Sequence, residues 1–313
     1  MPQSLRGLLV YNPNASTTTP RMLDVLTSAL GEELKLDVVG TQSRGHAVEL
    51  AAGARADGLD VVVALGGDGT ANEVTNGLLA AGPGPGVPAL AVVPGGCTNV
   101  FARAVGLPTD AVEATGQVLE ALRAGRRRRI GLGRADERWF LFAAGVGFDA
   151  EVVQRVEHAR AAGRRASGPL YAAVAARHWL LGGAERRRAP LLLRVPGAPV
   201  EPVFVCLVTN TDPWTYLLDK PVRPTPASSY DAGLDVFALR RVSTAATLRT
   251  LASIVGEQGS PRGRNVVGHH DLATFTVDAA AGRPQALQVD GDHLGLRAQV
   301  RFASVPAALD VVV

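Results

Sequence analysis

The sequence is poor in cysteine and has none of the long apolar runs that membrane-spanning helices need. Its 313 residues contain two cysteines, too few for a disulfide framework, and no C-x-x-C spacing indicates a metal site. No run approaches the ~20 apolar residues that span a bilayer, and the first residues lack the apolar core and cleavage site of a signal peptide. These absences exclude disulfide-stapled and membrane-spanning classes. We expect a cytoplasmic protein that at most binds peripherally at the inner face of a membrane.

The sequence also lacks a large charge of one sign. The net charge is +3, and every strong basic run is arginine, at residues 126–129, 164–165 and 186–188. Such runs are either solvated surface or a patch attracted to anionic lipid. Nucleic acid is not an expected partner.

Apolar residues, glycine and proline are abundant, and the length favours two domains. In the first third, apolar runs alternate with segments of helical spacing. We expect strands over residues 7–11, 34–39, 60–65 and 90–93, and helices over 20–30, 46–56 and 71–81. This alternation predicts a parallel sheet with helices on both faces, whose ligands bind at the carboxyl ends of the strands.

After the arginine run at 126–129 the pattern changes, and we place the domain boundary there. Short β-rich segments separated by turn signals are typical of an antiparallel sandwich. We expect such strands at residues 139–142, 191–195, 203–209, 234–239, 274–277, 286–289 and 298–302, with a helical insertion at about 150–188.

Residues 60–70 read DVVVALGGDGT, a buried strand followed by a glycine-rich loop and the start of a helix. Glycines let backbone N–H groups approach an anion, and the positive end of a helix attracts it. Asp68 would repel a phosphate in this loop unless a cation lay between them, which suggests Mg²⁺. The alternative is a tight strand-to-helix turn with Asp68 as the N-cap.

A second loop of the same kind follows the next strand. Residues 92–103 read VVPGGCTNVFAR, with a glycine pair, small polar residues and a helix start. Two such loops after neighbouring strands of one sheet suit a nucleotide better than two unrelated turns. Their spacing fits neither G-x-G-x-x-G nor G-x-x-x-x-G-K-[ST], so the common Rossmann and P-loop interpretations fail.

GGDGTANEV, at residues 66–74, resembles the signature shared by the diacylglycerol kinase catalytic domain, the sphingosine kinases and, more distantly, NAD kinases and phosphofructokinases. Further segments resemble the bacterial diacylglycerol-kinase-like lipid kinases in the same order: YNPNA (11–15), PGGCTNVFARAVGLP (94–108), AAGVGFDAEVV (143–153), YDAGLDVFAL (230–239) and VDGD (289–292). The resemblance implies an ATP-dependent lipid kinase. Its fold would be a Rossmann-like three-layer α/β nucleotide domain (1–128), a C-terminal antiparallel β-sandwich for the lipid substrate (129–302), and a chain end (about 303–313) that returns to the first domain.

The resemblance also implies a site for ATP with Mg²⁺, in which Asp68 and the ion neutralise the phosphates. The residues placed around ATP are Asn12, Pro13, Asn14, Thr41, Gly66, Gly67, Asp68, Gly69, Thr70, Ala71, Asn72, Gly96, Cys97, Thr98 and Asn99. Relatives usually carry threonine at the position of Cys97, and a thiol is a weaker hydrogen-bond partner than a hydroxyl. Thr98 or Asn99 are the candidates to replace that contact.

The VDGD segment corresponds to Asp-Gly-Glu in the family, whose glutamate is thought to accept the proton of the substrate hydroxyl. Here that position is Asp292, which is one methylene shorter. We expect Asp292 as general base and Asp290 as metal partner, with Asp290 as base the alternative. An ordinary Asp-Gly hairpin turn is the competing interpretation. Asp231 is a weaker metal candidate, because relatives often read Asp-Asp-Gly where this chain has Ala232 as the second residue.

The helical insertion is the candidate lipid-facing segment. Its apolar side consists of Leu170, Tyr171, Val174, His178, Trp179 and Leu181, and arginines flank it. Such a face suits the edge of an anionic membrane, and a helix packed on the sandwich is the equal alternative. Trp214 and Tyr216 either line the same pocket or fill the core. The adjacent His269 and His270 are expected to point apart into solvent rather than to bind a metal.

Two other functions stay open. An NAD kinase resembles this chain only at GGDGT. A nucleotide- or lipid-binding regulator with decayed catalysis would account for Cys97, Ala232 and Asp292. The sequence does not decide which lipid alcohol is phosphorylated, and a homodimer is also left open.

Overall fold

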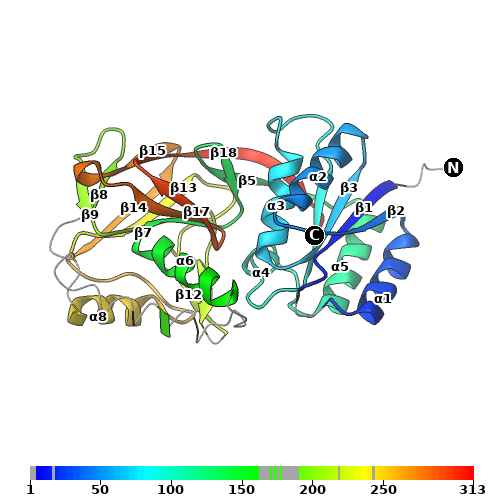
Figure 1. Cartoon of the computed structure of the whole chain (residues 1–313), viewed down its shortest axis with the longest axis horizontal. Coiled ribbons are helices and arrows are strands. Elements are labelled where there is room, and N and C mark those ends of the chain that lie inside the picture. Colours follow the sequence, from blue (N-terminus) through cyan, green and yellow to red (C-terminus); the bar gives the residue numbers. More distant parts are fainter. Residues whose placement is uncertain are drawn as a thin grey trace. The chain divides into compact units, whose positions relative to one another are not determined.

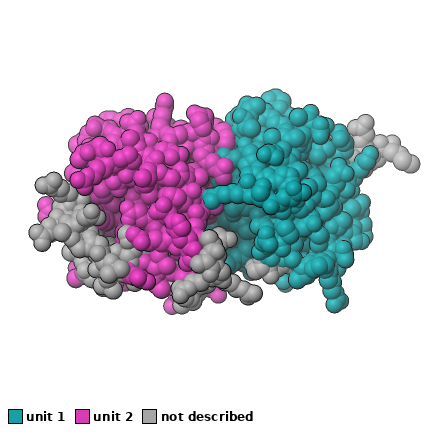
Figure 2. All heavy atoms as spheres, viewed as in Figure 1, with its two compact units in different colours: residues 1–132, 306–313 teal, residues 133–305 magenta. Residues whose placement is uncertain are grey.

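The computed structural model describes residues 5–15, 18–161, 170, 173–174, 177, 190–217, 219–241 and 244–313. The chain forms two compact units (Figure 2). One contains Met1–Leu132 and Pro306–Val313, and the other contains Gly133–Val305.

The first unit is built on a parallel sheet. Its strands are β1 (Leu5–Tyr11), β2 (Leu34–Gly40), β3 (Val61–Gly66), β4 (Ala89–Pro94) and the end of β18 (Gln299–Val311). The order is β2-β1-β3-β4-β18, and Val311 pairs with Leu90 at the β4 edge. β3 and β4 are buried along their whole length, as strands of a sheet covered on both faces must be.

Helices cover both faces of this sheet. They are α1 (Pro20–Gly31), α2 (His46–Ala56), α3 (Asp68–Leu78), α4 (Val100–Ala104) and α5 (Ala111–Arg123). α1 packs with α5 on one face, and α2 packs with α3 on the other (Figure 1). Asp110 fixes the start of α5, because its Oδ1 accepts hydrogen bonds from the N–H groups of Val112 and Glu113 at 2.9 and 3.0 Å.

The described residues of the second unit form two larger, mainly antiparallel sheets and the two-stranded sheet β11-β12. One of the larger sheets has the order β18-β15-β8-β9, with β5 beside β18 and β6 beside β5, and the other has the order β14-β13-β10-β7-β16-β17. The strands are β5 (Arg128–Ala135), β6 (Arg138–Phe140), β7 (Ala143–Gly147), β8 (Leu191–Arg194), β9 (Glu201–Val203), β10 (Val205–Thr209), β13 (Leu234–Leu239), β14 (Val266–Leu272), β15 (Thr274–Ala279), β16 (Gln285–Val289) and β17 (Asp292–Arg297). The other elements that the structure describes in this unit are α6 (Phe148–Ala161), α8 (Thr244–Ile254), the 3-10 turn η2 (Ala280–Gly282) and the hairpin β11 (Thr215–Leu217) with β12 (Lys220–Val222).

Side chains from both sheets share one buried core. Phe275 and Phe302 stack at 5.1 Å between ring centroids, and they belong to the same cluster as Val146 and Val236 of the facing sheet. Cys206 lies in this cluster, and burial raises the pKa of its thiol to about 12. A thiol held neutral in an apolar core is a packing residue rather than a nucleophile.

The predicted combination of an α/β domain and an antiparallel sandwich is confirmed. α2 has its predicted bounds, whereas α3 begins three residues before the predicted start because Gly67 is its extended N-cap. α5 has no counterpart among the predicted elements.

The predicted insertion at 150–188 begins with the greater part of α6. Of its apolar side, Tyr171, His178, Trp179 and Leu181 lie outside the described residues, as do the flanking arginines. Trp214 is partly buried and packs against a small core cluster that includes Val205 and Phe237. Among the residues that the structure describes, no helix has the length and hydrophobicity to cross a membrane.

Candidate active site

The predicted nucleotide residues of the first unit gather at the carboxyl ends of β1, β2 and β3. Thr41 N–H donates to the Tyr11 carbonyl at 2.8 Å, and Asn12 N–H donates to the Leu65 carbonyl at 3.1 Å. Asn12 Oδ1 also accepts from Asn14 N–H at 2.9 Å. The direction in which successive strands are added reverses between β1 and β3 in the order β2-β1-β3-β4, and such a switch point is where open α/β sheets bind ligands.

The two glycine-rich loops contact each other backbone to backbone. Gly95 N–H donates to the Gly66 carbonyl at 2.7 Å. A Cβ added to Gly96 would lie 2.7 Å from Gly67 Cα, which is closer than real Cβ contacts allow. The sequence prediction that these loops are neighbours is therefore realised by direct contact, and that contact requires glycine at Gly96.

Asp68 connects the first loop to α4. Its Oδ2 and Oδ1 accept hydrogen bonds from the N–H groups of Val100 and Phe101, both at 3.0 Å. Burial raises the pKa of the Asp68 carboxyl above its ordinary value, although these two bonds oppose the shift. The alternative that Asp68 is the N-cap of its own helix is wrong in detail, because Gly67 occupies that position and Asp68 binds the start of α4.

The second loop is shaped by Asn99, which has a left-handed backbone with φ of 49°. Asn99 Oδ1 accepts from Gly96 N–H at 2.9 Å, and its Nδ2 donates to the Gly96 carbonyl at 3.0 Å. Cys97 is exposed and Thr98 is half-buried. Asn99 thus holds the loop, and Thr98 is the better placed of the two candidates to replace the hydroxyl that Cys97 lacks.

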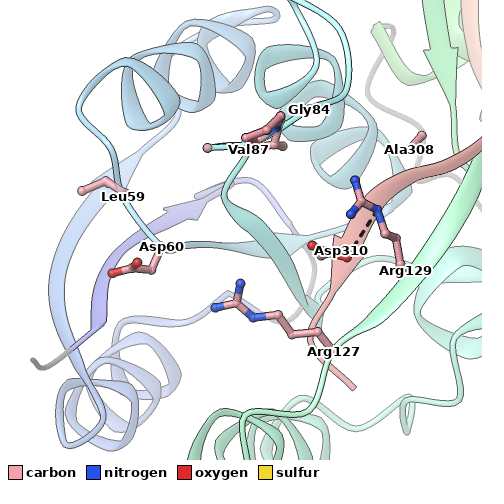
Figure 3. A pocket seen from close by; sticks show the side chains of 10 residues that line it. Leu59, Asp60, Gly84, Val87, Arg127, Arg129, Ala308 and Asp310 are labelled. Carbon is pink, nitrogen blue, oxygen red and sulfur yellow. Dashed lines mark ion pairs between the residues drawn. The ribbon is translucent and has the colours of Figure 1, made fainter. Parts of the chain in front are cut away.

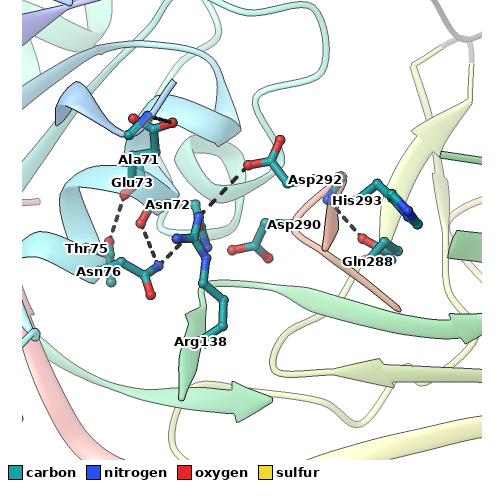
Figure 4. A network of polar contacts seen from close by, with 12 residues as sticks. Ala71, Asn72, Glu73, Thr75, Asn76, Arg138, Gln288, Asp290, Asp292 and His293 are labelled. Carbon is teal, nitrogen blue, oxygen red and sulfur yellow. Dashed lines mark hydrogen bonds and ion pairs between the residues drawn. The ribbon is translucent and has the colours of Figure 1, made fainter. Parts of the chain in front are cut away.

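The residues that follow Gly69 belong to the first turns of α3, and the Thr70 side chain packs against Gly66. Thr70, Ala71 and Asn72 are buried. Asn76 Nδ2 donates to the Asn72 carbonyl at 2.8 Å, and Thr75 Oγ1 donates to the Ala71 carbonyl at 2.8 Å (Figure 4). These loops therefore present mainly backbone groups to a ligand.

In the second unit, VDGD forms the turn between β16 and β17. Val289 pairs with Asp292, and the two residues between them have left-handed backbones, with φ of 47° at Asp290 and 83° at Gly291. This is the two-residue turn that Asp-Gly favours. The competing interpretation of an ordinary hairpin turn is right about the local geometry.

The two aspartates of this turn have different surroundings. Asp290 is 4% exposed and accepts backbone N–H groups from Leu141, Phe142 and Ala143 at 2.7, 3.0 and 3.0 Å. Asp292 has a side chain that is 22% exposed, and its Oδ2 lies 4.0 Å from Arg138 Nη2 (Figure 4). Asp290 therefore anchors the segment between β6 and β7, while Asp292 is the more accessible carboxylate. Arg138 lies outside the sequence motifs from which the site was predicted.

The third acidic candidate is not part of a metal cluster. Asp231 is exposed. Asp235 is buried, and its Oδ1 lies 2.7 Å from His270 Nδ1, whereas His269 Nε2 lies 2.9 Å from Glu201. The two histidines point to different partners, as predicted for neighbours on a strand, but His269, whose side chain is 22% exposed, binds Glu201 instead of pointing into solvent as expected. Within the described ranges, no three His, Cys, Asp or Glu side chains are grouped to hold a metal ion.

A cavity of about 510 Å³ lies at the opposite, amino-terminal edge of the first sheet (Figure 3). Arg127 and Arg129 of the arginine run reach into it, facing Asp60 and Asp310. Arg129 Nε donates to the Ala307 carbonyl at 2.9 Å and lies 3.9 Å from Asp310 Oδ1. Part of the arginine run thus has local partners. The cavity has equal numbers of opposite charges and none of the predicted nucleotide residues.

Comparisons with known proteins identify relatives of this chain. Residues 6–135 match the family model described as the diacylglycerol kinase catalytic domain. The diacylglycerol kinase of Staphylococcus saprophyticus is 33% identical over 45% of this chain and 45% of the relative, and that of Bacillus subtilis is 34% identical over 45% and 46%. The alignment therefore spans less than half the length of these relatives.

A solved structure extends the likeness in fold to the whole chain. A putative diacylglycerol kinase from Bacillus anthracis superposes with a TM-score of 0.76 at 18% identity, covering 100% of this chain and 98% of that one. At this identity the superposition shows a shared fold.

Proposed function

We propose that this protein is a lipid kinase, because residues 6–135 match the model of the diacylglycerol kinase catalytic domain. It transfers the γ-phosphate of ATP to the hydroxyl of diacylglycerol or a related lipid alcohol. One observation supports this most: two glycine-rich loops meet backbone to backbone beside the switch point of a parallel sheet. Such a site binds phosphate through N–H groups and the start of a helix.

In this proposal the first unit binds ATP. The loops after β1, β2 and β3 surround the nucleotide through Asn12, Thr41 and residues 66–70, and the second loop adds Gly96, Thr98 and Asn99. α3 directs its positive end at the phosphates, since it begins at Asp68 directly after the loop. Catalysis of phosphoryl transfer depends mainly on this positioning and on charge neutralisation.

The residues present fit a magnesium ion at Asp68. In kinases Mg²⁺ usually binds one or two carboxylates together with substrate phosphates and water. Each Asp68 oxygen accepts one backbone N–H, and a carboxylate oxygen has about two lone-pair sites, so each keeps one. Bound there, Mg²⁺ would neutralise phosphate charge. We do not assign magnesium binding to Asp290, which is already bonded to three backbone N–H groups, or to the exposed Asp231.

Asp292 is the proposed general base. It is the more accessible acidic residue of VDGD, with a side chain that is 22% exposed, and Arg138 Nη2 lies 4.0 Å from its Oδ2. Its role is to take the proton from the lipid hydroxyl as that oxygen attacks the γ-phosphorus. Asp290 is assigned to the turn instead.

The proposal includes peripheral binding at the cytoplasmic face of an anionic membrane. Exposed arginines such as Arg126 and Arg127, with a net charge of +3, support attraction to anionic lipid. Sedimentation with phosphatidylglycerol vesicles and not with phosphatidylcholine vesicles is the expected result. Equal sedimentation with both would contradict it. The homodimer stays a prediction.

The test of function is incubation of the purified protein with γ-labelled ATP, Mg²⁺ and mixed micelles of single lipids. Diacylglycerol, a sphingoid base and phosphatidylglycerol form parallel arms, and NAD in buffer forms another. We expect label in a lipid product that chromatography separates. Label in NADP alone would replace the proposal with an NAD kinase, and ATP binding without any labelled product would replace it with a regulator.

A further inference from the structure

α6 holds the β16–β17 hairpin at two points, of which the first lies within the AAGVGFDAEVV segment (143–153) and the second lies outside the segments that carry the resemblance. The first point is Asp149, in the first turn of the helix. Gln288 Nε2 donates to Asp149 Oδ2 at 2.7 Å, and Gln288 Oε1 accepts from Gly291 N–H at 3.0 Å. Gln288 is 3% exposed. One buried amide therefore connects the helix to the turn.

The second point lies about two helical turns further along α6. Glu157 Oε1 accepts from His293 N–H at 3.2 Å. The two backbone N–H groups that α6 fixes, directly or through Gln288, are thus those of Gly291 and His293. These are the residues on either side of Asp292.

The space that Asp149 and Gln288 occupy depends on the absence of a side chain at Gly145. A Cβ on Gly145 would lie 2.2 Å from Asp149 Oδ2 and 2.9 Å from Gln288 Nε2, so a glycine on β7 makes space for the pair. Burial raises the pKa of Asp149 to about 6, although the hydrogen bond from Gln288 acts to lower it. Burying a carboxyl that has one amide partner lowers the stability of the fold. Its presence at this position therefore indicates a specific role.

We infer that Asp149, acting through Gln288, and Glu157, acting through the His293 N–H, are positioning residues that set the direction of the Asp292 carboxylate. The inference rests on the proposed function for its consequence in catalysis. A general base must reach the proton that it accepts, and a misplacement of about 1 Å can lower a rate ~100-fold. Fixing the peptide units on both sides of Asp292 prevents such drift.

The kinetic test compares Asp149→Ala, Asp149→Asn and Glu137→Gln, a control at a carboxylate that is 94% exposed. Asp149→Ala should lower kcat about 10- to 100-fold, with KM for ATP within about twofold. An asparagine side chain keeps an oxygen that accepts from Gln288, so Asp149→Asn should retain most of kcat, and Glu137→Gln should match the wild type. Wild-type kcat in Asp149→Ala would overturn the inference.

A double-mutant cycle separates positioning from general stability. If Asp149 acts through Asp292, Asp149→Ala should not lower kcat any further in an Asp292→Asn background. An equal fall in both backgrounds would overturn the inference. Should Asp149→Ala fail to fold, Gln288→Leu removes the same connection, and Glu157→Ala removes the other.

A readout that needs no activity distinguishes this inference from the proposed function. Hydrogen exchange of the Gly291 amide should become at least about tenfold faster in Asp149→Ala or Gln288→Leu, and that of His293 in Glu157→Ala. Unchanged exchange at both amides would refute the positioning, whatever reaction the protein catalyses. Faster exchange with no lipid kinase activity in the wild type would refute the proposed function and leave the positioning standing.

Discussion

The two candidate parts of the active site use different chemical groups. In the first unit the nucleotide loops present backbone, and their glycines are required because Gly67 and Gly96 touch. In the second unit the hairpin presents one side chain, Asp292, whose surroundings are fixed by long-range hydrogen bonds. A backbone site is therefore sensitive to added atoms, whereas a side-chain site is sensitive to the loss of supporting groups.

Of the substitutions that compare Asp292 with Asp290, Asp292→Asn should have the larger effect on activity. Asp292→Asn removes the proposed base and should lower kcat about 10²- to 10⁴-fold, with the free energy of unfolding within about 0.5 kcal/mol of the wild type. Kinase assays and urea unfolding measure the two quantities. A fall in stability without a fall in kcat would show that Asp292 is a structural residue.

Asp290→Asn should show the opposite pattern. The new amide places N–H groups against the backbone N–H groups of Leu141, Phe142 or Ala143. Leaving a buried donor unpaired costs about 1–3 kcal/mol, so the urea midpoint should fall. The folded fraction should keep a larger share of kcat than Asp292→Asn does. Equal kcat losses in the two folded variants would remove the distinction between them.

The backbone site is tested by Gly96→Ala. Its Cβ would lie 2.7 Å from Gly67 Cα, and relief of such overlap costs about 1–3 kcal/mol. We expect weaker ATP binding by calorimetry and a lower unfolding midpoint. Gly116→Ala is the matched control, because a Cβ there meets nothing within 4 Å and lies in helix α5. Unchanged ATP affinity in Gly96→Ala would show that the loops do not bind the nucleotide.

The buried Asp149 predicts a pH dependence of stability. Its pKa is raised to about 6, so the folded state retains a proton that the unfolded state releases near pH 4. The wild type should therefore lose stability relative to Asp149→Asn as pH rises from about 4 to about 6, by up to about 3 kcal/mol. Urea unfolding of both proteins between pH 4 and 8 measures this. A pH-independent difference would contradict it.

The His270–Asp235 pair should give the smallest effect. The hydrogen bond and charge of Asp235 raise the pKa of His270, so the pair stabilises the fold below the ordinary histidine pKa and loses that contribution as pH rises through the raised one. His270 is 54% exposed, so the contribution should stay below about 1 kcal/mol. Comparing His270→Gln with the wild type at pH 5 and 8 checks it, and a larger difference at pH 8 would contradict the sign.

The sequence predicted the backbone site better than the side-chain site, for physical reasons. Strand, glycine loop and helix are local in the chain, so the position of residues 66–70 after β3 follows from pattern alone. The partners of Asp68, Asp290 and Asp149 lie far along the sequence. No periodicity shows that Asp290 binds the segment before β7, so the difference between Asp290 and Asp292 required the structure.

The central claim is that ATP binds the glycine loops and that Asp292 activates a lipid hydroxyl. The most direct test measures ATP affinity and single-turnover transfer to lipid in the same preparations of wild type and Asp292→Asn. We predict equal ATP affinity, with labelled lipid formed by the wild type and almost none by the variant. Equal transfer by both proteins, or ATP binding without labelled lipid in the wild type, would contradict the account.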